Sequence, residues 1–194
     1  MGSGDPGTTG PGIFGIRLLE VLKTHRPDIE RHLILSTWAE ATIKHETNYT
    51  TQAVRDLSTT THSPKNMASA LVSGSFLTDG MVVVPCSMKT LAAIRHGLGD
   101  NLLARAANVT IKERRRLILV TRESPLSAIH LENMLELARL GITIFPPVPA
   151  FYARPHTLSE AVDYTVVRIL DQLGVHIPWT VRWGEPRIQP PDLS

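Results

Sequence analysis

Short apolar runs rich in β-branched residues alternate along this chain with segments whose apolar positions recur at helical spacing. The runs have the length of buried strands, and the amphipathic segments between them have the length of helices. Such alternation predicts an α/β fold, a doubly wound parallel sheet with helices on both faces. The predicted strands are 32–35, 80–84, 117–120 and 142–145, and the predicted helices are 12–24, 38–45, 87–96, 101–113, 128–140 and 157–173.

The first residues depart from this alternation. Residues 1–7 contain neither β-branched residues nor an apolar run, so no strand is predicted ahead of the first helix. Gly10 and Gly12 would let the backbone approach a phosphate closely, but a flexible leader or a cloning remnant explains these glycines equally well. We expect a glycine-rich leader at 1–11, one domain at 12–178 and a C-terminal tail at 179–194.

Composition narrows the class of protein. With 194 residues, 42% of them apolar, the chain can bury one substantial core. It has neither an apolar run near the roughly 18 residues of a membrane span nor a secretory or transit pattern at its start, which predicts an intracellular protein without membrane contact. The 20 basic and 18 acidic residues are too evenly balanced to suggest nucleic acid, so small anionic ligands are the better candidates.

The chain offers few residues for metal or disulfide chemistry. Its single cysteine, Cys86, excludes an internal disulfide and is read as a small buried residue at a strand end. The histidines form neither a metal-binding pair at helical spacing nor a Ser-His-Asp pattern. We therefore expect no metal site and no triad hydrolase.

Polar or ring-bearing residues follow every predicted strand. They are Ser36, the segment 85–90, the segment 121–123, and the proline-rich segment 146–152. In parallel sheets, ligands bind beyond the carboxyl ends of the strands, where loops and helix N-termini offer free N–H groups. These residues are therefore expected to converge on one rim.

Several of these residues allow two interpretations. Ser87 can cap a helix or contribute, with its neighbours, to a cradle for a phosphate or a flavin edge. Arg122 can fork onto a phosphate with Glu123 orienting it, or the two can form a surface ion pair. Glu46 and Lys112 lie near helix ends, where charged residues are usually only solvated. The stiff segment 146–152 places the hydroxyl of Tyr152 within reach of an anion.

A series of motifs resembles the UbiX/Pad family of flavin prenyltransferases, in particular its fungal phenylacrylic acid decarboxylase branch. Residues 36–47 read STWAEATIKHET, close to the family's S-K-W-A-E-A-T-I-K-x-E-T. Many long matches in the same order make the resemblance specific. The further matching motifs are GSF at 74–76, PCSMKTLAAI at 85–94, LARAANV at 103–109, KERRR at 112–116, PVPAFY at 147–152 and RW at 182–183.

The resemblance implies a flavodoxin-like homododecamer that joins a dimethylallyl group from dimethylallyl phosphate to N5 and C6 of reduced FMN without a metal ion. The product, prenylated FMN, would serve a UbiD-type decarboxylase. Positions matching the family's flavin contacts are Ser36, Ser87, Met88, Lys89, Thr90 and Arg122, with Gly10 and Gly12 in the glycine loop. Tyr152 and Arg168 match positions that hold dimethylallyl phosphate, and Glu46, Lys112, Arg122 and Glu123 match charged catalytic positions around the phosphate and the transferring proton.

At the N-terminus the chain departs from the family, whose members usually have an apolar strand before the glycine loop. Because that strand is central, its absence is expected to leave two neighbouring strands without ladder partners. The absent strand leaves a non-catalytic FMN-binding regulatory oligomer as one alternative function, and the family's older name gives a direct phenylacrylic acid decarboxylase as another. A cytoplasmic location is expected for the sequence as given, and a mitochondrial one if the native leader is longer.

Overall fold

The computed structural model describes residues 12–177, which form alternating helices and strands. Gly10, the tail at 179–194 and the RW motif lie outside the described residues, and the predicted domain boundaries stay predictions. In chain order the elements are α1 (Ile13–His25), β1 (His32–Ile34), α2 (Thr37–Glu46), α3 (Thr51–Arg55), β2 (Thr60–His62), η1 (Ala70–Val72), β3 (Gly80–Cys86), α4 (Met88–Arg95), α5 (Leu102–Lys112), β4 (Arg116–Thr121), α6 (Ala128–Arg139), β5 (Thr143–Ile144), η2 (Phe151–Ala153) and α7 (Leu158–Leu173).

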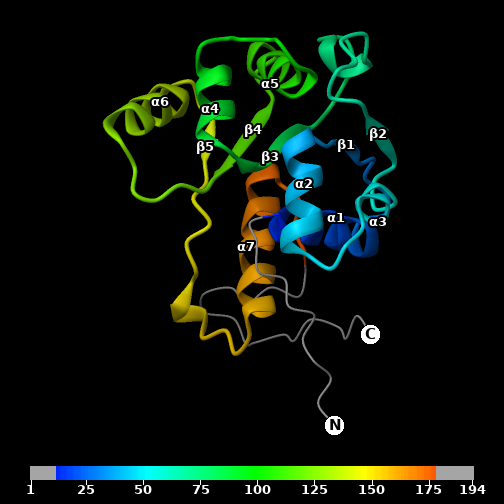
Figure 1. The fold of residues 1–194 in the computed structure, drawn as a ribbon, viewed down its shortest axis with the longest axis vertical. Helices are drawn as coiled ribbons and strands as arrows, with labels where there is room; N and C mark the ends of the chain where they lie inside the picture. Colours follow the sequence, from blue (N-terminus) through cyan, green and yellow to red (C-terminus); the bar gives the residue numbers. More distant parts are fainter. Residues whose placement is uncertain (1–11, 178–194) are drawn as a thin grey trace.

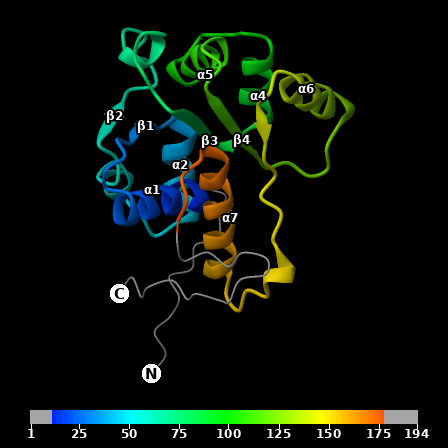
Figure 2. The same cartoon turned by 180° about the vertical axis from the view of Figure 1, so that it is seen from behind.

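The strands form two parallel groups. β1 pairs with β2, and β4 pairs with β3 on one side and β5 on the other. Figures 1 and 2 show the same order across the molecule, β2-β1-β3-β4-β5, seen from opposite sides. Within residues 12–177, β1 and β3 each have a ladder partner on one edge only, as expected if a central strand is missing from between them.

Both the α/β class and the predicted elements are confirmed, because each of the six predicted helices and four predicted strands has its counterpart in the structure. Side-chain oxygens of Ser36, Ser87, Ser127 and Thr157 each accept a backbone N–H in the first turn of the following helix, which explains where those helices begin. The sequence pattern missed α3 and β2. Strand β2 is a short edge strand of two threonines and a histidine, so it lacks the apolar run used to find strands.

Helix α1 lies between two parts of the core. Its Leu18, Val21 and Leu22 pack with α7 and β4, while its Ile16 and Leu19 pack with Leu35 and residues of α2 and α3. The opposite face of β3 and β4 is covered by α4, α5 and α6. Helix α1 therefore packs against both groups of strands and holds them together, although the two groups do not hydrogen-bond with each other.

Two histidines, one on β1 and one on β2, lie in contact. His62 Nε2 lies 3.0 Å from His32 Nδ1, and His62 Nδ1 lies 3.0 Å from Ser69 Oγ. Burial and, secondarily, the neighbouring His32 lower the pKa of His62 below its usual value. Between the lower pKa of folded His62 and the usual histidine pKa, this side chain is therefore mostly neutral in the folded protein and mostly protonated in the unfolded chain.

We expect stability to fall as the pH drops below about 6.5, the pKa of an unfolded histidine, down to the lower pKa of folded His62. Above that window His62 is neutral in both the folded and the unfolded state, so its titration does not change the stability of the protein. Thermal unfolding of the protein and of His62→Gln at a series of pH values measures the effect. An identical pH dependence in the two proteins would contradict this assignment.

Candidate functional site

A large cavity separates β1 from β3. Its volume is about 1760 Å³, and its lining combines both strands with residues of α1, α2, α4 and α5. Most of the residues selected from the sequence reach it. The predicted site residues in its lining are Gly12, Ser36, Glu46, Ser87, Lys89, Thr90, Arg122 and Glu123.

Two capped helix N-termini face this cavity. Ser36 Oγ accepts the N–H of Ala39 at 3.1 Å, and Ser87 Oγ accepts the N–H of Thr90 at 3.2 Å. Ser87 also donates to the Thr90 hydroxyl at 3.0 Å. The capping interpretation of Ser87 is thus correct, and it is compatible with a cradle because the remaining first-turn N–H groups and Lys89 stay near the same point.

Helix α1 begins close to these two helices. Its N-cap is Gly12, which provides no side-chain cap, and a Cβ at Gly12 would meet the Thr42 methyl group at 3.5 Å. One turn later, a Cβ at Gly15 would lie 3.1 Å from the carbonyl oxygen of Val84. The start of α1 is therefore held against α2 and the carboxyl end of β3, where its free N–H groups suit an anion.

Arg122 and Glu123 follow β4 and are exposed. Glu123 Oε1 accepts the N–H of Ser124 at 3.3 Å. The ion pairs of the described residues include neither side chain, which disfavours the interpretation as a mutual surface pair. The Arg122 guanidinium is available to an anionic ligand.

Glu46 is the last residue of α2, and one of its carboxylate oxygens is unusual. Oε2 is buried and has no hydrogen-bond partner within the described part of the chain. A buried polar oxygen without a partner costs free energy, so such an oxygen in a cavity wall points to a ligand that satisfies it. Glu46 is half-buried overall and lines the cavity.

Capping and ligand binding by Ser87 can be separated experimentally. Ser87→Ala removes the cap of α4 and is expected to lower the free energy of unfolding by about 1 kcal/mol. Ser127→Ala removes an equivalent cap from α6, away from the cavity, and serves as the matched control. Denaturant unfolding and flavin titration of both variants should show similar destabilisation, with weaker flavin binding in Ser87→Ala alone. Equal flavin affinity in the two variants would leave Ser87 with a capping role only.

The proline-rich segment does not join this rim in a single chain, so that prediction is wrong. No residue of 146–152 lines the cavity. After the two-residue strand β5, Pro146, Pro147 and Pro149 favour an extended backbone, and Figures 1 and 2 show this segment running away from the sheet to η2.

Tyr152 instead contacts the outer part of α7. Its hydroxyl hydrogen-bonds with the hydroxyl of Tyr164, and the two rings meet edge to face with centroids 6.0 Å apart. Burial, together with the hydrogen bond shared with Tyr152, raises the pKa of Tyr164 to about 12. Arg168, one turn beyond Tyr164, donates to Asp171 at 2.7 Å. Tyr152 thus contacts the face of α7 that also carries Arg168, and Tyr164 joins them there. The sequence could have indicated Tyr164, because residues four apart in a helix lie on the same face.

Lys112 lies at the other end of β4. It ends α5, and its Nζ is 2.5 Å from Glu113 Oε1, an ion pair that lowers the pKa of Glu113. Because β4 has six residues, Lys112 and Arg122 are separated by about 20 Å of strand. One chain therefore does not place them at one site. Met88, the first residue of α4, is also not part of the cavity lining.

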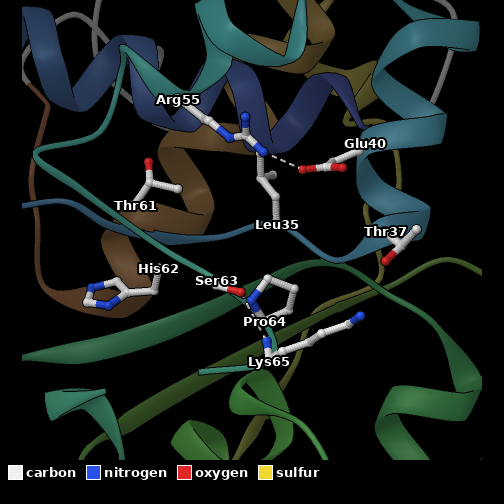
Figure 3. A pocket seen from close by; sticks show the side chains of 9 residues that line it. All are labelled: Leu35, Thr37, Glu40, Arg55, Thr61, His62, Ser63, Pro64 and Lys65. Carbon is white, nitrogen blue, oxygen red and sulfur yellow. Dashed lines mark hydrogen bonds and ion pairs between the residues drawn. The ribbon is translucent and has the colours of Figure 1, made fainter. Parts of the chain in front are cut away.

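A smaller pocket of about 350 Å³ lies beside the start of α2 (Figure 3). Arg55 of α3 and Glu40 of α2 form an ion pair across it at 2.5 Å. This pair fixes α2, which carries Ser36 and Glu46, against α3. Sequence reasoning missed this pocket because much of its lining comes from residues 61–65, which contain the end of the unpredicted strand β2 and the loop after it.

Cys86 is fully buried, and burial raises the pKa of its thiol to about 12, in agreement with a packing role. Across residues 12–177 there is no group of three or more metal-binding side chains. In the same residues no helix combines the length and the apolar character of a membrane span.

Comparison with known proteins identifies the family. Residues 11–170 match the Flavoprotein family. The chain is 57% identical over 181 residues to a probable UbiX-like flavin prenyltransferase of Bacillus subtilis, covering 93% of this chain and 87% of the relative. This chain belongs to the UbiX-like flavin prenyltransferase family.

Other members extend the comparison. The mitochondrial flavin prenyltransferase PAD1 of Saccharomyces cerevisiae is 54% identical, over 91% of this chain and 72% of the relative. A crystal structure of AnUbiX (PadA1) in complex with FMN and dimethylallyl pyrophosphate has a TM-score of 0.82 at 50% identity, covering 91% of this chain and 94% of that one. A dodecameric FMN-dependent UbiX-like decarboxylase from Escherichia coli O157:H7 has a TM-score of 0.87 at 50% identity, covering 92% and 96%. These structures confirm the flavodoxin-like fold.

Proposed function

We propose that this UbiX-like chain is an FMN prenyltransferase that transfers a dimethylallyl group from dimethylallyl phosphate to N5 and C6 of reduced FMN, forming prenylated FMN. The observation that carries the proposal is the convergence of three helix N-termini and Arg122 on one large cavity. A flavin bound there has an anionic phosphate, which helix N-termini and a guanidinium stabilise. Family membership and the FMN complex of a 50% identical protein support the choice of flavin.

The flavin-binding residues in this proposal are those of the cavity. Gly12 would allow the phosphate to approach the start of α1, while Ser36, Ser87, Lys89, Thr90 and Arg122 would hold the remaining polar edges. Reduced FMN supplies the electron-rich atoms that attack the prenyl carbon. The apolar walls of the cavity would exclude water that could trap a positively charged allylic group.

The phosphate that leaves dimethylallyl phosphate must also be stabilised by positively charged side chains. As the allylic C–O bond breaks, negative charge develops on the phosphate, and Arg168, Lys112, Arg122 and the Tyr152 hydroxyl would stabilise it. Lys112 and Arg122 lie at opposite ends of β4 in one chain. We therefore propose that neighbouring copies complete the site, in a dodecamer like the one described for the Escherichia coli relative.

Exposed apolar side chains support such an assembly. Val148 and Phe151 lie close to Tyr152 in sequence and Leu158 begins α7, and their exposed fractions are 73%, 76% and 74%. Large apolar side chains grouped in this way usually mark protein–protein contacts. Burial between copies would place Tyr152 and Arg168 inside the oligomer.

The product would be used by a UbiD-type decarboxylase, the recipient that the family resemblance implies. Its compartment stays a prediction; the yeast relative is described as mitochondrial. A non-catalytic FMN-binding oligomer is the second candidate, and the cavity left between β1 and β3 is the observation that favours it. The charged residues around the phosphate argue against it, since a pure flavin binder does not need them.

Anaerobic incubation of the purified protein with reduced FMN and dimethylallyl phosphate tests the proposal. We expect the flavin mass to increase by one five-carbon unit. Tight flavin binding without this increase would favour the non-catalytic oligomer. Absence of flavin binding would contradict both functions.

A further inference from the structure

One face of helix α7 carries three half-buried polar residues, Tyr164, Arg168 and Asp171. Their spacings of four and three residues place them on the same side of the helix. On the opposite side, Val166 and Ile169 are fully buried in the core. Because this packing fixes the rotation of α7 about its axis, the three polar side chains start from fixed positions at the edge of the core.

Asp171 anchors the guanidinium of Arg168. Asp171 Oδ2 accepts from Arg168 Nη1 at 2.7 Å, and Asp171 Oδ1 lies 3.0 Å from His176 Nδ1. Only 7% of the Asp171 side chain is exposed, against 43% of the Arg168 side chain. A carboxylate so little exposed is stable only when it is paired, so it keeps its hold on the guanidinium. Arginine has five N–H donors, and tethering one corner leaves others to fork onto a phosphate.

Tyr164 anchors the hydroxyl of Tyr152 in the same way. Tyr152 lies in η2, outside the core, and is 64% exposed. Its hydroxyl hydrogen-bonds with that of Tyr164, and the two rings meet edge to face. Since burial and this hydrogen bond raise the pKa of Tyr164 to about 12, the Tyr164 hydroxyl stays protonated at neutral pH and the contact persists.

The two anchored pairs belong to one cluster. Arg168 lowers the pKa of Tyr164 and Asp171 raises it, so both charged groups lie within electrostatic reach of the Tyr164 hydroxyl. Each pair therefore combines one group that is more exposed, Tyr152 or Arg168, with one less exposed partner on α7 that restricts it.

We infer that Tyr164 and Asp171 are positioning residues, which hold the Tyr152 hydroxyl and the Arg168 guanidinium in the arrangement that receives the phosphate of dimethylallyl phosphate. The inference rests on the proposed function, in which Tyr152 and Arg168 bind this donor. Charge alone would have the opposite effect at Asp171, because a carboxylate repels a phosphate. The direction in which an Asp171 substitution changes donor affinity therefore separates positioning from simple electrostatics.

Donor affinity in double-mutant cycles tests the inference. Calorimetry gives the Kd of dimethylallyl phosphate for the native assembly loaded with oxidised FMN, which lacks the electrons needed for transfer. We expect Tyr164→Phe to weaken binding by about 5-fold, the effect of one neutral hydrogen bond, and Asp171→Asn by about 10-fold. A residue that acts through another has no effect once the other is gone. Tyr164→Phe should therefore cost nothing further in Tyr152→Phe, nor Asp171→Asn in Arg168→Ala.

Glu136→Gln on α6 is the matched control, because Glu136 pairs with an arginine three residues away as Asp171 does, and it should leave the Kd unchanged. If Asp171→Asn does not fold, Asp171→Glu, which shifts the carboxylate by one methylene, takes its place in the cycle. Losses that multiply in the double variants would overturn the inference, as would tighter binding by Asp171→Asn or no binding by the unmodified protein.

The same proteins show whether the proposed function fails separately. Reduced FMN and mass spectrometry report transfer of the five-carbon unit, whereas the cycles report donor binding alone. Cycles as expected without a mass gain would reject the transferase function and retain the two positioning residues. A mass gain with multiplying losses would retain the transferase and reject the positioning role.

Discussion

Arg168→Ala is expected to lower kcat/KM for dimethylallyl phosphate by about 100- to 1000-fold, the effect of removing one donor that stabilises charge developing in a transition state. The reason is its position on α7 one turn from Tyr164, whose hydroxyl hydrogen-bonds with that of Tyr152 in η2. There the guanidinium is partly exposed and is held by Asp171 at 2.7 Å, so it can meet an anionic ligand. Rates of flavin mass gain at varied donor concentration measure the effect.

Two controls make the Arg168 experiment specific. Arg168→Lys keeps the charge but loses the planar fork, so it should recover only part of the activity. Arg139→Ala removes an arginine that is likewise paired with a carboxylate one turn away on an exposed helix face, Glu136, and should leave turnover unchanged. FMN affinity should be the same in all of these proteins, because Arg168 is not part of the cavity lining. Unchanged turnover in Arg168→Ala would remove it from the donor site.

The sequence predicted the elements that are set by local periodicity and capping. Ser36 and Ser87 stand directly after apolar runs and before amphipathic segments, and each proved to be an N-cap at a helix start on the same cavity. Their convergence could be predicted because the carboxyl ends of parallel strands share one edge of a sheet. The same rule gave Arg122 its correct place after β4.

Within one chain, the sequence could not predict positions that tertiary geometry decides. Tyr152 follows a strand as Ser36 does, but β5 is only two residues long and the prolines after it lead the chain away from the rim. Lys112 was grouped with Arg122 through family resemblance, although β4 separates the two residues. No local sequence pattern predicts how far Tyr152 lies from the rim or Lys112 from Arg122. Both distances depend on strand length, and in the proposed oligomer they also depend on neighbouring copies.

The unpaired edges of β1 and β3 were predicted in part. The sequence pattern shows no strand ahead of the first helix, which predicted unpaired edges, and β1 and β3 have them among the described residues. Periodicity could not predict how the two groups of strands are placed relative to each other. That placement depends on α1, whose Ile16 and Leu19 pack toward β1 and α2 while Leu18, Val21 and Leu22 pack toward α7 and β4. A helix buried on several sides can join two groups of strands that share no ladder.

Glu46→Gln is expected to slow ring closure by about 100- to 10,000-fold, the usual contribution of a general base, while the five-carbon mass gain continues. Closing the ring at C6 releases a proton, and in the proposed mechanism Glu46 would accept it through the buried Oε2, which has no hydrogen-bond partner in the described residues. Glutamine keeps the shape of this side chain and one acceptor oxygen, but it replaces the other oxygen with an NH2 donor and does not take up the proton.

The measurement must separate the two bonds, so mass spectrometry of the flavin is combined with its absorption spectrum, which changes when the fourth ring closes. Glu40→Gln on the same helix is the matched control, because the Glu40 carboxylate is paired with Arg55 outside the large cavity and should not affect ring closure. If Glu46→Gln closes the ring at the rate of the unmodified protein, the released phosphate must accept the proton instead. Loss of the mass gain itself would place Glu46 earlier in the reaction, at binding or at cleavage of the C–O bond.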